Sequence, residues 1–288
     1  MTLIVLLACL ALQYFTNTTG ALPRFDWMRL YTKSASSFLD KSSLWGSIWG
    51  LLALLIPPLF VVGLIDLVLH AKVFGLMEFL FSLIILLYCM YAENLRFKLQ
   101  PYFEALSRQD FNAANQAAED YLIGKLPTQP AELCRSITQL FFDKALVQVF
   151  SYLFWFAILG VYGVTIYYVV SSLRRLASEN NNIASPFLTI AKQAQAILDW
   201  IPLRLAGLSY ALVGHFANGF GYWLKHLFSG IDANPELTWK FGLAALNKDP
   251  NDLRADLEEN KASITLVHHA VIVWLVAIAL VVVCYWMA

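Results

Sequence analysis

Charged residues are scarce in this chain of 288 residues: they make up 14% of it, while 59% of the residues belong to the hydrophobic set. A soluble globular domain usually carries about 25% charged and about 45–50% apolar residues. Lys and Arg together number 20, as do Asp and Glu, so no net charge attracts a charged partner. These shortages exclude a disordered chain, a nucleic-acid-binding domain and a secreted disulfide scaffold. They predict a membrane protein whose main partner is the lipid bilayer.

Motifs for catalysis by soluble enzymes are also missing. The chain contains no GxxxxGK[ST], no GxGxxG, no HExxH and no GxSxG, so we predict no catalytic residue and no cofactor. Cysteine is rare, and its spacing does not match that of metal ligands. The four cysteines are Cys9, Cys89, Cys134 and Cys284. We expect reduced thiols and no metal site.

Four long stretches almost without charge predict membrane-spanning helices, because about 20 apolar residues cross a hydrocarbon core of about 30 Å. These stretches are 44–65, 73–92, 145–173 and 262–288, and only the second contains a charged residue, Glu78. No strand pattern of useful length occurs. The predicted fold class is therefore all-α: a polytopic integral membrane protein with about four transmembrane helices plus amphipathic or interfacial helices.

The same pattern divides the chain into six segments, three in the membrane and three outside or at its surface. They are an N-terminal apolar segment with a basic juxtamembrane stretch (1–43), a transmembrane hairpin (44–92), a cytoplasmic helical region (93–144), a third membrane segment (145–173), an extramembrane or interfacial helical region (174–261) and a C-terminal transmembrane helix (262–288).

Three segments leave alternatives open. Residues 2–15 are apolar but short, which favours an embedded or interfacial helix over a signal peptide. Residues 205–223 lack charge but are rich in Gly and Ser, so we favour an interfacial or packed helix over a fifth span. The stretch 154–168 contains Gly160 and Gly163, and it either crosses the membrane or re-enters it.

Lys and Arg in short loops predict the orientation, because they accumulate on the cytoplasmic side. Residues 16–43 and 93–144 are the basic stretches, so both are predicted to be cytoplasmic. Four simple crossings would place 174–261 on the opposite side. However, Arg174 and Arg175 directly follow the third segment, as in a cytoplasmic flank, and the side of this region stays open.

Local signals predict where some helices begin and end. Asp110 is a suitable N-cap for a helix that starts at Phe111, and another helix is expected after Pro130. A break is expected near Pro202. The pair Pro57-Pro58 removes two backbone donors in mid-span and should kink the first transmembrane helix, which either shapes a cavity or only serves packing.

Two carboxylates belong to the transmembrane hairpin. Asp66 lies at the end of the first span and Glu78 about two turns into the second. An ionisable group in lipid costs about 2.5–3.5 kcal/mol on insertion scales, so it usually has a partner or a function. The short connection brings both residues to the same membrane face. They form either a functional polar cluster or an interfacial Asp with a Glu paired to a neighbour such as Lys72.

The stretch from Asp199 to Arg204 is rich in residues that bind ligands or interfaces. These two charged residues flank Trp200 and Pro202. An Arg can bind a carboxylate or a phosphate in bidentate fashion. Alternatively, Trp200 is an interfacial aromatic residue and Arg204 extends its charged group to the membrane surface.

Several motifs resemble the AmpE family of inner-membrane proteins, which are associated with β-lactamase induction in Gram-negative bacteria. The resemblance rests on Phe154-Trp155 ahead of Gly160 and Gly163, on DWIPLRL at 199–205 and on YALVGH at 210–215. It implies a regulatory or sensory membrane protein that responds to β-lactams or cell-wall turnover. A small cell-wall-derived ligand or a cell-wall amidase is the implied partner, and a homo-oligomer is left open.

The resemblance also implies a ligand site at the membrane surface. Its candidate residues are Asp199, Trp200, Arg204, Tyr210 and His215.

The AmpE family is related to the CbiB/CobD membrane synthases of cobalamin biosynthesis, and this relation gives an alternative: an ATP-dependent amide-forming synthase. The acidic motifs of those synthases are degenerate in this chain. Where they have Glu-Asn and then Asp, this sequence has Asp143, Lys144 and Val147, and their Asn-Thr-Leu-Asp is Ser-Ser-Leu-Arg at 171–174. The departures favour a protein that is not an enzyme.

Overall fold

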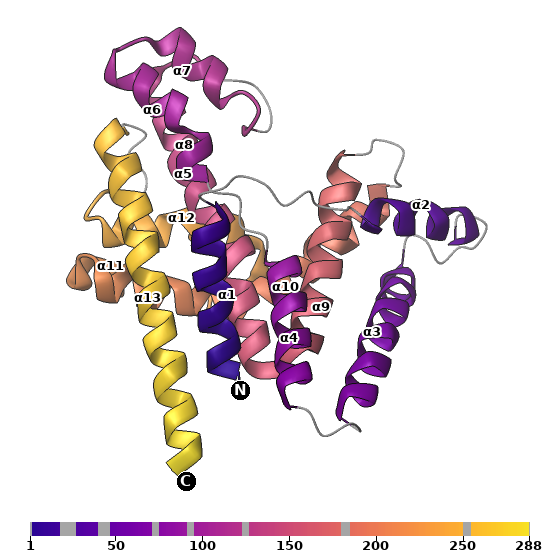
Figure 1. Ribbon diagram of the computed structural model, residues 1–288. Helices are drawn as coiled ribbons and strands as arrows, with labels where there is room; N and C mark the ends of the chain where they lie inside the picture. The colour runs from indigo at the N-terminus through magenta and orange to yellow at the C-terminus, as the bar shows by residue number, and fades with distance from the viewer. Residues whose placement is uncertain are drawn as a thin grey trace. The chain divides into compact units, whose positions relative to one another are not determined.

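The computed structural model describes residues 2–17, 27–39, 47–70, 75–90, 95–122, 127–179, 185–249 and 255–287. All regular structure in these ranges is helical (Figure 1), which confirms the predicted all-α class. The chain divides into two compact units. Unit 1 comprises residues 1–91 and 151–199, and unit 2 comprises residues 92–150 and 200–288.

Four helical stretches of the described chain are long and apolar enough to cross a membrane, which confirms the predicted number. They are Ile48–Leu69, Pro130–Ser178, Phe187–Val213 and Leu257–Cys284. One of the four predicted spans is not among them. The stretch 73–92 contains only a 15-residue helix, Gly75–Cys89, whereas 187–213 joins the long apolar helices because its few charged side chains are well separated.

Unit 1 contains five helices and the first part of a sixth. They are α1 (Thr2–Asn17), α2 (Trp27–Leu39), α3 (Ile48–His70), α4 (Gly75–Cys89), α9 (Ser151–Glu179) and the part of α10 (Ser185–Val213) that ends at Asp199. Helix α9 packs against α3 and α4, and α1 packs against α4. The mostly apolar sequences of α1, α3 and α4 leave many hydrophobic side chains exposed, as lipid-facing helices do.

The chain reverses inside α9 at Gly160. This residue has φ 57° and ψ −139°, a conformation open mainly to glycine. Gly163 then passes so close to the preceding arm that a Cβ there would lie 2.4 Å from the Trp155 carbonyl oxygen. The ring centroids of Tyr152 and Tyr167 are 4.8 Å apart, so residues before and after the turn lie side by side. The predicted third membrane segment is therefore not one straight span: of the two alternatives, the structure has a helical hairpin.

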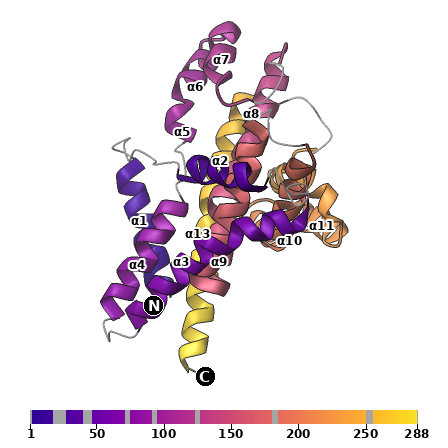
Figure 2. The ribbon, with the colours of Figure 1, turned by 90° about the vertical axis from the view of Figure 1, so that its right-hand side faces the viewer.

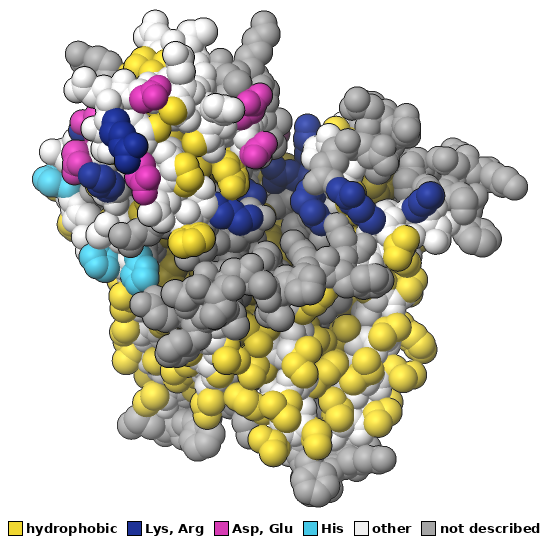
Figure 3. Space-filling view, turned by 45° about the horizontal axis from the view of Figure 1, so that its top comes forward, with side chains coloured by type: hydrophobic (Ala, Val, Ile, Leu, Met, Phe, Trp, Pro, Cys, Tyr) yellow, Lys and Arg dark blue, Asp and Glu magenta, His cyan; other side chains and the backbone are white. Residues whose placement is uncertain are grey.

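Basic residues lie at one end of unit 1, around α2. Tyr168 on the second arm of α9 contacts Trp27 of α2 and Tyr88 of α4, with ring centroids 6.1 and 5.7 Å apart. Both ribbon views show α2 lying crosswise to α9 at this end (Figures 1 and 2). The exposed Arg29 and Lys33 of α2 lie here. In Figure 3, Lys and Arg side chains form a row at the edge of the apolar surface on the side of α2 and α3.

Helix α10 continues without a break through Pro202, so the predicted break there is wrong. Proline lacks the N–H that would bond to the carbonyl oxygen four residues earlier, which is that of Leu198. The indole Nε1–H of Trp155 donates to this carbonyl oxygen at 3.2 Å. The freed acceptor is thus satisfied by a side chain from α9, and the helix does not need to end.

Unit 2 contains the remaining helices. They are α5 (Leu95–Lys98), α6 (Gln100–Ser107), α7 (Phe111–Ala118), α8 (Pro130–Ala145), the π-helical turn Leu146–Phe150, the end of α10, α11 (Phe216–His226), the 3₁₀ turn Ile231–Ala233, α12 (Asn234–Ala245) and α13 (Leu257–Met287). The predicted start of α7 is confirmed, because the Asp110 carboxylate accepts a hydrogen bond from the Ala113 backbone N–H. The start of α8 at Pro130 is also as predicted. Helix α12 was not predicted.

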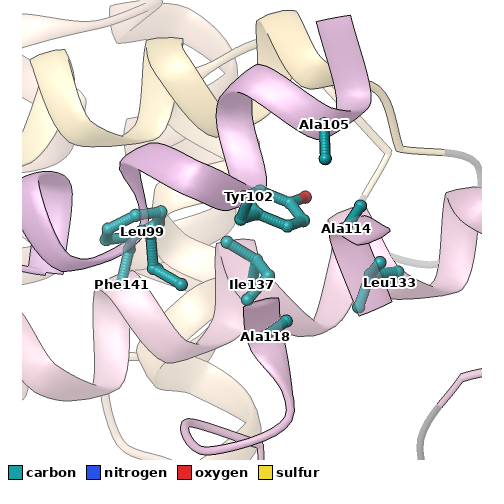
Figure 4. Close-up of a cluster of buried hydrophobic side chains, with 8 residues drawn as sticks. All are labelled: Leu99, Tyr102, Ala105, Ala114, Ala118, Leu133, Ile137 and Phe141. Carbon is teal, nitrogen blue, oxygen red and sulfur yellow. The ribbon is translucent and has the colours of Figure 1, made fainter. Parts of the chain in front are cut away.

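The three helices α6, α7 and α8 share a hydrophobic cluster. Its buried members are Leu99, Tyr102, Ala105, Ala114, Ala118, Leu133, Ile137 and Phe141 (Figure 4). The small alanines of α6 and α7 let these two short helices approach each other closely. Burial raises the pKa of the Tyr102 phenol, so it remains a hydrogen-bond donor, and it donates to Asn260 Oδ1 at 2.7 Å.

A buried polar network joins α8 to α13 beside this cluster. Arg135 NH1 lies 3.1 Å from Glu259 Oε1, and both side chains are almost completely buried. Asn260 Nδ2 donates to Thr138 Oγ1 and to the Cys134 carbonyl oxygen. Since each of these groups would be costly to bury alone, the network fixes the register of α13 on α8.

Candidate functional site

Unit 1 contains a cavity of about 230 Å³ that is lined by Asp66 of α3 and Glu78 of α4. It lies where the end of α3, the beginning of α4 and the turn of α9 meet. Its lining consists of Val5, Asp66, Glu78, Phe79, Ser82, Phe156, Leu159, Gly160, Val161 and Tyr162. The structure thus places Asp66 and Glu78 together on one cavity, at the end of the unit opposite to α2.

Tyr162 connects α9 to this pair. Its phenolic hydroxyl donates to Asp66 Oδ2 at 2.8 Å. Tyr162 follows Gly160 by two residues, so the reversal of the chain at Gly160 determines where the phenol points. The site therefore combines two carboxylates, a phenol and the Ser82 hydroxyl on three elements. Such a set favours a ligand that donates hydrogen bonds or carries positive charge.

Asp199 is buried within unit 1, with 5% of its surface exposed. Its Oδ1 accepts hydrogen bonds from the Ser151 hydroxyl and the Tyr167 hydroxyl, each at 2.7 Å. These donors come from the two arms of α9, on either side of the Gly160 turn. The carboxylate therefore holds the two arms of the hairpin against α10.

Arg204 belongs to unit 2 and serves a different set of partners. Its NH2 donates to the Ser229 carbonyl oxygen at 2.8 Å, and its Nε donates to that of Leu227 at 3.3 Å. Its NH1 donates to Asn234 Oδ1 at 2.5 Å. The guanidinium also lies over the Trp200 ring, 4.6 Å from the centroid. All three guanidinium nitrogens thus bind the chain itself and fasten the loop after α11 to α10.

The other two predicted ligand residues lie apart from Arg204. Tyr210 is fully buried between the rings of Phe142 and Phe150, at centroid distances of 5.3 and 5.8 Å. His215 is exposed in the junction between α10 and α11, and its backbone N–H donates to the Ala245 carbonyl oxygen at 2.6 Å. Four of the five residues lie on α10 and His215 precedes α11. Apart from the contact between Trp200 and Arg204, their surroundings are separate, and a ligand role for them stays a prediction.

Sequence reasoning missed Tyr162 and Ser82 as members of the cavity. Ser82 could have been found, because it lies one helical turn after Glu78 on the same face of α4. Tyr162 could not, since it lies 96 residues from Asp66 in the sequence. Within the described ranges, no three residues of the types His, Cys, Asp and Glu lie close enough together to hold a metal ion.

The long apolar helices, the hairpin at Gly160 and a polar cavity among apolar helices define the class: a polytopic helical membrane protein. A family model described as "Regulatory signalling modulator protein AmpE" matches residues 1–287. The chain belongs to the AmpE family.

One AmpE protein and two CobD proteins are similar to this chain over different lengths. Protein AmpE of Shigella flexneri is 26% identical over 218 residues, which are 74% of this chain and 76% of that protein. Cobalamin biosynthesis protein CobD of Chromobacterium violaceum is 30% identical over 93 residues, 32% of this chain and 30% of the relative. CobD of Stutzerimonas stutzeri is 26% identical over 125 residues, 43% and 41% of the two chains. No solved structure matches.

Proposed function

We propose that the protein is a regulatory component of the bacterial inner membrane that modulates β-lactamase induction in response to β-lactams or cell-wall turnover. The family match over residues 1–287 and its description as a signalling modulator support a regulatory role. The observation that carries the proposal is the cavity with Asp66 and Glu78, because it offers a site for a small polar ligand.

The cavity opens at the end of unit 1 that is remote from the basic residues of α2. Because Lys and Arg accumulate on the cytoplasmic side, the cavity belongs to the outer side of the membrane in this proposal. Cell-wall fragments and β-lactams reach the membrane from that side. A fragment with a free ammonium group would pair with the two carboxylates and with the Tyr162 oxygen. The volume of the cavity admits the end of the fragment that carries the ammonium group, but not the whole fragment.

In the same proposal, the stretch 199–215 has a positioning role. Asp199 joins the arms of the α9 hairpin, and Arg204 donates four hydrogen bonds from its five N–H groups to oxygens of its own chain. A guanidinium with four of its five N–H groups engaged in this way is poorly suited to bind ATP or a substrate carboxylate. The alternative of a CobD-type synthase therefore has less support, although the similarity to the two CobD proteins justifies testing it directly.

The test uses a strain that lacks the gene and carries an inducible β-lactamase. It is complemented with the wild-type chain, with the double variant Asp66→Asn/Glu78→Gln, or with Glu132→Gln, which neutralises an exposed carboxylate of α8 as a control. β-Lactamase activity is measured with and without a β-lactam, and membrane levels of each chain by immunoblot. Since coupling between sites is about 5–150-fold, we expect the double variant to change induction at least about fivefold and Glu132→Gln to leave it unchanged.

Two results would contradict the proposal. Induction that is the same with and without the gene would remove the regulatory role. Restored growth of a cobalamin-synthase deletion strain on the wild-type chain would instead assign the catalytic alternative. If deletion changes induction but the double variant behaves like wild type, the regulatory role stands and the cavity is not its ligand site.

A further inference from the structure

A second cavity in unit 1 is almost entirely apolar and lies at the other end of the helices. Its volume is about 510 Å³, and we call it the apolar groove. It is lined by Trp27, Tyr31, Pro57, Pro58, Val61, Val62, Ile84, Ile85, Tyr88, Cys89, Thr165 and Tyr168, which belong to α2, α3, α4 and α9. Val61 and Ile84 are 54% and 63% exposed, so the groove opens onto the surface that faces lipid.

Helix α2 closes one end of the groove and separates its residues by type. Trp27 and Tyr31, one helical turn apart, line the groove. Met28 and Thr32 are buried against the unit. Arg29 and Lys33 are exposed on a third face, which they share with Leu30, itself 60% exposed. A helix with aromatic residues towards the apolar region and basic residues away from it lies in the interface of a membrane.

The wall of the groove is fixed by hydrogen bonding around Pro58. This proline leaves the Leu54 carbonyl oxygen without its usual helical donor. The Tyr31 hydroxyl donates to that oxygen at 3.1 Å. The same contact ties α2 to α3, so the groove is a preformed space and α2 stays in place over it.

We propose that the apolar groove binds one hydrocarbon chain of an anionic phospholipid, whose phosphate lies near Arg29 and Lys33. The lining supplies apolar and aromatic contacts but almost no polar group, which suits a hydrocarbon chain. A methylene is about as large as a water molecule, whose share of the liquid is about 30 Å³, so the groove holds about 17 methylenes. That is the length of one acyl chain. Arg29 and Lys33, on the outward face of the helix that closes the groove, supply the charge complementarity for the headgroup.

The experiment measures which lipids stay bound. The protein is purified from bilayer nanodiscs that contain equal amounts of phosphatidylglycerol and phosphatidylethanolamine, and retained lipids are counted by native mass spectrometry. Val61→Trp and, independently, Ile84→Trp fill the groove from two helices. Ile56→Trp places the same bulk on an exposed position of α3 outside it. Size-exclusion chromatography verifies that each variant is folded, so failure of one filling variant leaves the other.

For wild type we expect about one tightly retained phosphatidylglycerol, with retention lowered at least about fivefold by either filling variant and not by Ile56→Trp. The pair Arg29→Gln/Lys33→Gln should reduce the preference for phosphatidylglycerol by about fivefold per charge, because a basic residue at the surface is worth about 1 kcal/mol. Arg108→Gln/Lys248→Gln, which removes two exposed charges of unit 2, is the matched control. Equal retention in the filling variants and in Ile56→Trp would overturn the proposal. Unchanged headgroup preference in Arg29→Gln/Lys33→Gln would overturn the assignment to an anionic lipid.

Discussion

Two of the three prolines inside long helices, Pro58 and Pro202, are tolerated because an aromatic side chain replaces the missing backbone donor. Tyr31 serves the Leu54 carbonyl that Pro58 leaves free, and Trp155 serves the Leu198 carbonyl that Pro202 leaves free. A carbonyl oxygen without a hydrogen bond is costly in apolar surroundings, so each aromatic residue stabilises the helix that contains the proline. The polar atoms of these residues are structural, even though Tyr and Trp at membrane interfaces are usually regarded as anchors.

A double-mutant cycle tests this pairing at α10. Trp155→Phe removes the donor and should destabilise the fold by about 1–3 kcal/mol. In the Pro202→Ala background the same change should cost less, because the substitution restores a backbone N–H that bonds to the Leu198 carbonyl oxygen. We expect a coupling of about 1 kcal/mol between the two sites, measured by unfolding of the four proteins in mixed micelles. Strictly additive losses would show that the indole contributes packing only.

Some residue-level features were predictable and others were not, for a physical reason. Asp110 and Pro130 act within one helical turn, so the local sequence was enough to predict their positions at helix starts. The prediction of a break at Pro202 was wrong because Trp155 lies 43 residues from its acceptor, and no local pattern reveals that contact. For the same reason, the sequence did not reveal that Tyr162 joins Asp66 and Glu78, because Tyr162 is far from both in the sequence.

At the scale of elements, the hairpin of α9 is the feature that organises unit 1. It brings Ser151 and Tyr167 into hydrogen bonds with Asp199. Next to its turn, it brings Tyr162 into a hydrogen bond with Asp66. The sequence allowed both a crossing and a re-entrant segment, since two glycines in an apolar run fit either. The backbone of Gly160 decides between them, because its positive φ cannot continue a helix.

Gly160→Ala tests the turn. The added Cβ meets no atom within 4 Å, so any loss of stability comes from the backbone conformation, at about 1–3 kcal/mol. Gly221→Ala is the matched control, because its Cβ also has open space and its backbone is helical. We expect a lower melting temperature only for Gly160→Ala, measured by the thermal loss of monodisperse protein. Equal melting temperatures for the two variants would contradict a strained turn at Gly160.

At the scale of the whole molecule, the hairpin changes the side on which the chain continues after α9. The chain leaves α9 on the side from which it entered that helix, because Tyr152 lies near Ser171, with their side-chain oxygens 3.4 Å apart. Four simple crossings had suggested the opposite side for the region after 173. Arg174 and Arg175 then lie at the same end as α2, in agreement with the rule that basic flanks face the cytoplasm.

Cysteine labelling tests this topology in whole cells. Cys9, Cys89 and Cys134 are buried, so Cys284→Ala gives a background with no exposed thiol among the described residues. Ser34→Cys and Ser178→Cys, both exposed positions, should react with a membrane-impermeant maleimide only after the cells are opened. Gly75→Cys should react in intact cells. Labelling of positions 34 and 178 from opposite sides would contradict the hairpin.

Two apolar helices of unit 1 are shorter than the hydrocarbon core of a membrane is thick. Helix α4 has 15 residues and α1 has 16, which corresponds to about 22 and 24 Å of rise against a hydrocarbon core of about 30 Å. Such a mismatch is relieved when the surrounding bilayer becomes thinner. A thinned bilayer brings water closer to Asp66 and Glu78 and lowers the cost of keeping them charged. Because neighbouring thinned patches share their deformation, we expect copies of the protein to gather in the thinner regions of a mixed membrane.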